Sequence, residues 1–338
     1  MADSGLFTFF TPPTQCFESC TKLWKTEDFK KHVQEMMQVL LAENQREKQQ
    51  VHPFLTVLHV ESAMFFIWQV IDFFKLSAEV RYIAFDIFQR FMLGYTESLL
   101  DHVVSITAEG RQRNRLIKEM EKQLKEQAPL KATICVMIAS KIVTHKTSLS
   151  TLMAQRCLKH LKLSAHINDI KRSEISILKQ LDWRCHRTSS LLEYIGLLIS
   201  VAGLWEGDGA YLAEMKRITI RPVPLEELFE MSTKLLDMVH LNHERVYQDL
   251  YSSLTGLAFI PNKHKTAFGK VVADRMLLAG SVVASAAFVL RGLEKCSTVI
   301  LSITTYTHTP CKDLIILASC IMNCAGLPCN IKSLLDNI

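Results

Sequence analysis

Two charged residues stand where the surrounding sequence pattern is apolar, and they are the strongest candidates for chemistry in this chain. Glu174 shares one face of a predicted helix with Ile170, Ile177, Leu178 and Leu181. An isolated carboxylate on such a face is costly, so it needs a partner. Lys141 stands at the C-terminal end of an apolar helix, where the helix dipole favours a cation. Lys141 and Glu174 can form ion pairs, either within the fold or with another protein, and each residue can do both.

Catalytic and metal-binding patterns are absent from the sequence. It contains no Gly-rich phosphate loop, no GxSxG, no HExxH and no paired-carboxylate motif. Histidines such as His145 and His160 are scattered, which favours surface or core positions. Cys320, Cys324 and Cys329 are the closest cysteines, but they lack the paired spacing of zinc sites. We therefore predict a protein that is not an enzyme, with no metal, no cofactor and no small-molecule substrate.

Composition indicates a helical globular protein. The 338 residues are 49% hydrophobic and 22% charged, with only 12 glycines and 9 prolines, so long helices in two bundles account for the length. The net charge of +5 is mild, so it neither indicates nor excludes direct nucleic-acid binding. Ten dispersed cysteines and a start without a secretory leader predict a reduced compartment, cytosol or nucleus. The most apolar run, residues 276–290, is short for a membrane span and predicts a buried core helix instead.

The elements that must position these residues are all predicted to be helical. Thr26 is a good N-cap for a helix in the N-terminal region, and Ser77 for a later one. Pro129 is predicted to begin the apolar helix that ends near Val143. The other predicted helices cover residues 54–74, 149–160, 167–183, 191–201, 225–238, 243–254, 271–290 and 312–324.

A charged insert at about 94–128 interrupts the apolar pattern between two of these helices. Its basic residues are Arg111, Arg113, Arg115 and Lys118, and its narrow apolar stripe is Ile117, Met120 and Leu124. The favoured interpretation is a solvent-exposed helix with few packing contacts to the rest of the protein, since charge runs are usually solvated faces. A docking helix and a basic nuclear-import signal are the alternatives.

Three segments resemble the cyclin box. Residues 75–93 resemble its second helix, residues 137–143 contain the A-S-K sequence of its buried third helix, and residues 172–185 resemble its fifth helix. The resemblance implies an all-α cyclin fold with two tandem five-helix bundles and an N-terminal helix. It also implies that Lys141 and Glu174 meet and contact a kinase.

The resemblance divides the chain into segments. It gives a flexible tail at 1–20, an N-terminal helix at 21–50, a first box at 54–190 that includes the insert, a divergent second box at 191–325, and a tail at 326–338. The chain departs from cyclins at the substrate-docking sequence M-R-A-I-L, since residues 59–63 read His-Val-Glu-Ser-Ala. The insert is a second departure, between the second and third helices.

The departures favour an atypical cyclin. That class implies a non-catalytic scaffold in the nucleus, at meiotic chromosomes, which promotes the maturation of recombination intermediates into crossovers. Its partners would be meiotic recombination factors, and the cytoplasm is the second compartment to consider. One alternative is a conventional cyclin that activates a cyclin-dependent kinase. Another is a cyclin-fold nucleic-acid-binding factor, for which only the insert offers a basic face.

Overall fold

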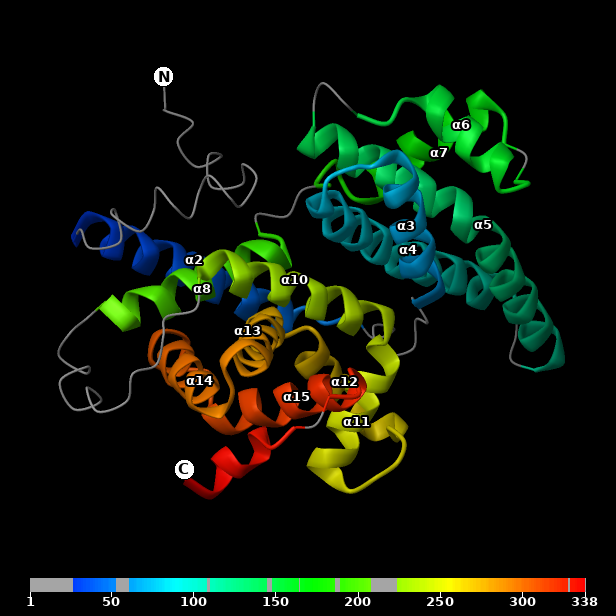
Figure 1. The fold of residues 1–338 in the computed structure, drawn as a ribbon. Helices are drawn as coiled ribbons and strands as arrows, with labels where there is room; N and C mark the ends of the chain where they lie inside the picture. Colours follow the sequence, from blue (N-terminus) through cyan, green and yellow to red (C-terminus); the bar gives the residue numbers. More distant parts are fainter. Residues whose placement is uncertain are drawn as a thin grey trace. The chain divides into compact units, whose positions relative to one another are not determined.

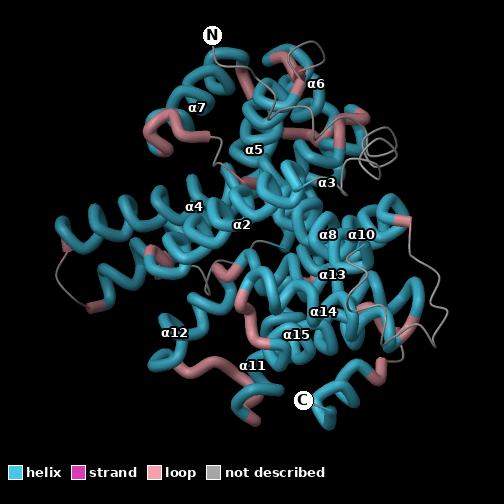
Figure 2. Tube along the Cα trace, turned by 90° about the vertical axis from the view of Figure 1, so that its left-hand side faces the viewer, coloured by secondary structure: helices cyan, strands magenta, loops and turns pink. Residues whose placement is uncertain are grey.

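The computed structural model describes residues 27–52, 61–107, 110–144, 148–163, 165–185, 189–207, 224–327 and 329–337. Within these ranges the chain forms thirteen α-helices and one 3-10 helix, and no strand (Figures 1 and 2). The chain divides into two compact units. Unit 1 combines residues 1–53 with 191–338, and unit 2 is residues 54–190.

Unit 2 is a bundle of helices around a buried central helix. Its helices are α3 (Glu61–Phe74), α4 (Ala78–Ile106), α5 (Arg111–Val143), α6 (Thr151–His160) and α7 (Ile167–Gln180). The ten consecutive residues 131–140 of α5 are all buried. This stretch is covered on every side because α5 packs against each of the other four helices (Figure 1).

The charged insert is the outer part of a helical hairpin. The C-terminal half of α4 and the N-terminal half of α5 lie side by side and extend beyond the other helices of unit 2 (Figure 2). The prediction that Pro129 begins a helix is wrong, since α5 begins at Arg111 and Pro129 lies inside it. Exposed residues from Lys125 to Gln127 precede the proline, so water reaches the carbonyl that the missing N–H leaves free.

Unit 1 is also built around one buried helix. Its elements are α2 (Glu27–Gln49), α8 (Leu191–Gly207), α10 (Leu225–Leu241), α11 (His243–Thr255), α12 (Asn262–Val272), α13 (Arg275–Arg291), α14 (Leu293–Thr307), α15 (Cys311–Cys324) and the 3-10 helix η2 (Ile331–Asn337). The small-residue helix α13 packs against α8, α10, α14 and α15. At Gly280 a Cβ atom would lie 2.8 Å from Leu314 Cδ2, so the glycine permits the close approach of α15.

Sequence patterns missed two helices of unit 1, α12 and α14, and placed the start of α13 too early. The stretch predicted as one helix over 271–290 contains the end of α12 and most of α13, because Asp274 begins a new helix by accepting a hydrogen bond from the Leu277 N–H at 2.9 Å. Both α12 and α14 were absent from the prediction. The predicted tail at 1–20, the cap at Thr26 and residues 54–60 lie outside the described residues.

Among the described helices, none by itself is long and apolar enough to cross a membrane. The pair α12 and α13 satisfies length and composition together, with a bend of 65° between them. Most of α13 is buried in unit 1, which is the burial expected of a core helix.

The N-terminal helix α2 is fixed to the start of α13 by buried polar contacts. Asn44 Nδ2 donates to Asp274 Oδ1 at 2.9 Å. Asn44 Oδ1 accepts from the backbone N–H groups of Arg275 at 2.8 Å and Met276 at 3.3 Å. Lys48 Nζ pairs with Asp274 Oδ2. Since these bonds satisfy the free N–H groups of a helix N-terminus, α2 is an integral part of unit 1.

Candidate functional site

The A-S-K sequence at the end of α5 gives each of its residues a separate task. Ala139 is fully buried, where only a small side chain packs. Ser140 Oγ donates to the Met137 carbonyl at 2.8 Å and accepts from the Leu149 N–H at 2.9 Å. Ser140 therefore ties the chain after α5 back onto the helix, and Lys141 is the first residue to reach solvent.

Lys141 and Glu174 form an ion pair between α5 and α7. Lys141 Nζ donates to Glu174 Oε1 at 2.5 Å. The lysine side chain is 44% exposed and the glutamate side chain 17%. A pair this exposed contributes about 1 kcal/mol or less to folding. The structure thus brings together the two residues that the sequence singled out, while leaving the cation open to a second partner.

Large apolar side chains are exposed on α7, which carries Glu174, and on its neighbour α6. Leu152 and Met153 lie in the first turn of α6, and Ile175 follows Glu174 on α7. Helices α5, α6 and α7 pack against one another. We call the set Lys141, Leu152, Met153, Glu174 and Ile175 the α5–α7 face. Sequence reasoning missed its three apolar members, because only packing shows which side of a short helix is left uncovered.

A buried lysine of α5, Lys131, contacts α4 and α7 close to Glu174. Lys131 Nζ lies 5.6 Å from the ring centre of Phe91 and 6.0 Å from that of Tyr95, and it donates to Ser173 Oγ at 3.4 Å. Burial lowers the pKa of Lys131. These contacts join α4, α5 and α7 at the residue preceding Glu174, so Lys131 helps to set the position of that carboxylate.

Arg90 of α4 fixes the chain that leaves α7. Its Nε donates to Asp86 Oδ2 at 2.7 Å, its Nη1 to the Arg184 carbonyl at 2.8 Å and its Nη2 to the Cys185 carbonyl at 2.8 Å. The planar guanidinium suits two neighbouring carbonyls in a way that an ammonium does not. The sequence pattern marked Arg90 as part of the second helix of the box, and the structure shows its positioning role.

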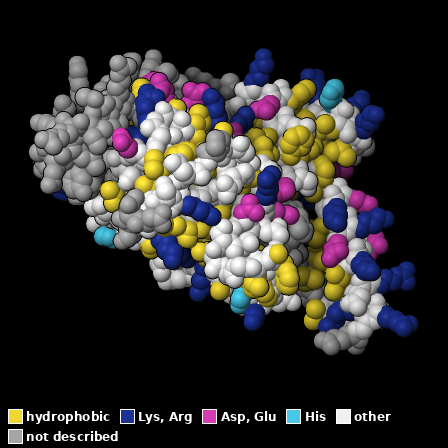
Figure 3. Space-filling view, turned by 60° about the horizontal axis from the view of Figure 1, so that its bottom comes forward, with side chains coloured by type: hydrophobic (Ala, Val, Ile, Leu, Met, Phe, Trp, Pro, Cys, Tyr) yellow, Lys and Arg dark blue, Asp and Glu magenta, His cyan; other side chains and the backbone are white. Residues whose placement is uncertain are grey.

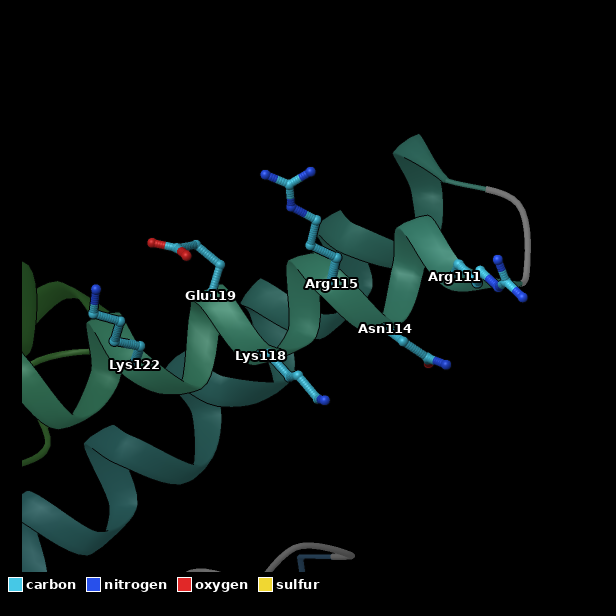
Figure 4. Close-up of a pocket in the computed structure, with 6 residues that line it drawn as sticks. All are labelled: Arg111, Asn114, Arg115, Lys118, Glu119 and Lys122. Atoms are coloured by element: carbon cyan, nitrogen blue, oxygen red, sulfur yellow. The ribbon is translucent and has the colours of Figure 1, made fainter.

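The basic residues of the insert do not act as one group. Arg111, Arg115 and Lys118 are spaced i, i+4, i+7 on α5, and with Asn114, Glu119 and Lys122 they border an open stretch of this helix, from which their side chains point outward in different directions (Figure 4). Arg113 instead donates Nη2 to the Thr107 carbonyl at 2.7 Å, which closes the hairpin. Three of the four residues therefore point outward, and their role in docking or import stays a prediction.

Five of the thiols in the described residues are buried, and Cys311, Cys324 and Cys329 are partly exposed. Burial raises the pKa of Cys135, and it raises that of Cys296 to about 12. Cys320, one of the three clustered cysteines, is buried beside Ser253. Within the described ranges no three His, Cys, Asp or Glu side chains come together as a metal site.

Unit 2 is a helical bundle around its buried third helix, α5, and a Lys–Glu pair joins that helix to the fifth, α7. This arrangement and the relatives described next define an all-α protein of the cyclin fold. The chain is 25% identical over 228 residues to the human protein named "Cyclin N-terminal domain-containing protein 1", a match that covers 65% of this chain and 64% of the relative. It is 26% identical over 225 residues to the mouse protein of that name, covering 66% and 63%. No family model matches the chain.

These matches make the chain cyclin-like and give it a distant resemblance to the two relatives. The match spans less than two thirds of each relative's length. Proteins with cyclin domains are generally regulatory and work through contacts with other proteins.

Proposed function

We propose that this chain is a non-catalytic regulatory protein of the cyclin type that holds protein partners on its α5–α7 face. The half-exposed Lys141, held against Glu174 and flanked by exposed apolar side chains, is the observation that carries the proposal. A protein interface combines apolar anchors with a few charges that fix orientation. The α5–α7 face has both on three helices that pack against one another, and the ion pair itself contributes only about 1 kcal/mol or less to folding.

The proposed setting is meiotic recombination in the nucleus, where the chain would act at chromosomes as a scaffold that promotes the maturation of recombination intermediates into crossovers. The partners would then be recombination factors. The distant resemblance to the two relatives and to atypical cyclins supports this setting. The absence of the M-R-A-I-L sequence at residues 59–63 supports a scaffold over a protein that recruits kinase substrates.

Activation of a cyclin-dependent kinase is the second candidate function. The observation that favours it is the Lys141–Glu174 pair itself, because the resemblance to cyclins implies that these two positions contact a kinase. Both candidates use the α5–α7 face, so they differ in the identity of the partner and not in the surface.

Affinity capture from meiotic cells tests the proposal. The variant is Lys141→Ala with Glu174→Ala, which removes both charges and leaves the net charge unchanged. The matched control is Glu230→Ala with Lys234→Ala, which removes an equally simple Lys–Glu pair, 2.7 Å long, on α10 of unit 1. We expect at least one captured partner to be lost with the first variant and retained with the control.

The identity of that partner separates the two candidates. Recombination factors without a kinase support the scaffold, and a near-stoichiometric kinase whose activity depends on the chain supports the conventional cyclin. If the folded α5–α7 variant retains every partner that the control retains, the proposed interface is wrong.

A further inference from the structure

Helices α11 and α12 of unit 1 have no counterpart in the described part of unit 2. In unit 2 the second helix α4 leads to the central helix α5 through residues 107–110. In unit 1, α11 and α12 stand between the second helix α10 and the central helix α13. Helix α11 packs on α15, and α12 packs on α2. The two added helices therefore extend the bundle without forming its centre.

The corner between these helices exposes large apolar side chains within six residues of one another. Leu254 lies in the last turn of α11, Leu257 follows the helix, and Phe259 is 71% exposed. Single exposed apolar residues are common on proteins, but three so close together form a patch. An exposed phenylalanine gains most when a partner covers it, since aromatic side chains carry a large apolar area.

The corner is held in a defined shape. Gln248 Nε2 donates to the Ala258 carbonyl at 2.8 Å, and the hydroxyl of Tyr251 bonds His264 Nδ1 at 2.6 Å. The ring of Tyr251 also lies 5.2 Å from that of Phe268, edge to face, which joins α11 to α12 beneath the loop. A surface ordered before binding loses little conformational entropy when a partner arrives.

The corner is basic. Residues 250–273 contain no Asp or Glu, and α12 carries Lys263, Lys265 and Lys270. In the part of the chain that the structure describes, none of the three lysines has an ion-pair or hydrogen-bond partner. The flanking carboxylates are Asp249, which lies on α11 near Cys320, and Asp274, which is engaged as the cap of α13. Figure 3, which brings the lower side of Figure 1 forward, shows hydrophobic side chains at the surface of the molecule among Lys, Arg, Asp and Glu side chains.

We propose that this corner, defined by Leu254, Leu257, Phe259, Lys263 and Lys270, binds a short acidic amphipathic segment of a partner protein. The apolar side chains of that segment pack on Phe259 and Leu257, and its carboxylates face the lysines of α12. The site lies on unit 1 and is separate from the α5–α7 face. A membrane surface is less favoured, because three lysines fall short of the roughly four to eight basic residues typical of anionic lipid binding.

Selection from a displayed library of random peptides of about twelve residues, with the full chain as bait, tests the proposal. The corner variants are Leu257→Ser with Phe259→Ser, and Lys263→Glu with Lys270→Glu. The matched controls are Leu301→Ser, an exposed apolar residue of α14, and Lys312→Glu, an exposed lysine of α15. Far-UV circular dichroism and thermal unfolding establish that each variant is folded.

We expect the enriched peptides to combine Asp or Glu with large apolar residues. Their affinity should fall about thirtyfold or more with either corner variant, as for the loss of a hot spot, and it should be unchanged in the controls. Charge reversal should also remove the salt dependence of binding. The proposal fails if no enriched peptide depends on the corner or if the dependent peptides are not acidic. It also fails if the corner instead controls binding to vesicles of phosphatidylcholine with phosphatidylserine.

Discussion

Exchanging the charges of Lys141 and Glu174 separates the internal role of the pair from its role toward a partner. Lys141→Glu alone places two carboxylates where Nζ and Oε1 now lie 2.5 Å apart. The lost attraction of a half-exposed pair is about 0.2 to 1 kcal/mol, and repulsion of like charges adds a similar amount. The free energy of unfolding should therefore fall by about 1 kcal/mol, with a comparable loss for Glu174→Lys.

The double variant, Lys141→Glu with Glu174→Lys, restores an ion pair of opposite direction. We expect its stability, measured by urea denaturation, to return to within about 0.5 kcal/mol of the original chain. Partner capture should stay lost, because a protein that reads a cation on α5 and an anion on α7 meets the reverse arrangement. The reasoning is refuted if the exchanged chain captures its partner normally, since the pair would then be only an internal brace.

Three further predictions concern unit 1 and are measured as changes in urea or thermal unfolding of the full chain. Lys295 is only 4% exposed and burial lowers its pKa to about 8, so the folded chain releases this proton before the unfolded chain does. Stability should therefore rise between about pH 8 and 10.5. Lys295→Met should remove that rise, and an unchanged pH profile would contradict the burial. Gly280→Ala should lower the free energy of unfolding by about 1 to 3 kcal/mol, because its Cβ would meet Leu314. Gly196→Ala, whose Cβ would have no atom within 4 Å, should stabilise α8 by up to about 1 kcal/mol, and equal effects of the two changes would contradict the packing of α13. Asn44→Ala should cost about 2 to 3 kcal/mol by leaving two N–H groups of α13 unbonded, and a cost near zero would mean that α2 is not docked there.

Sequence reasoning found the charged pair because both residues break an apolar pattern, and such breaks are visible without a structure. It missed Leu152 and Met153, whose exposure depends on which side of α6 lacks a neighbour. It also missed Ser140, whose role depends on a hydrogen bond to a residue nine positions later. These properties belong to tertiary packing, which local patterns do not contain.

The helices that escaped prediction have a similar explanation. Helix α14 is rich in Thr, Ile and Val, which have weak helix propensity, and it forms because Val299, Ile300 and Ile303 are buried against its neighbours. The start of α5 was misplaced because Pro129 is a good helix beginner, yet the helix continues through it. In both cases packing energy outweighed the local preference of the residues.

Hydrogen exchange of the chain with and without its captured partner tests the central claim most directly. If partners bind the α5–α7 face, backbone amides in Thr151–His160 and Ile167–Gln180 should exchange more slowly in the complex, and those in Leu225–Leu241 should be unaffected. Slower exchange confined to other helices, with α6 and α7 unchanged, would contradict the account.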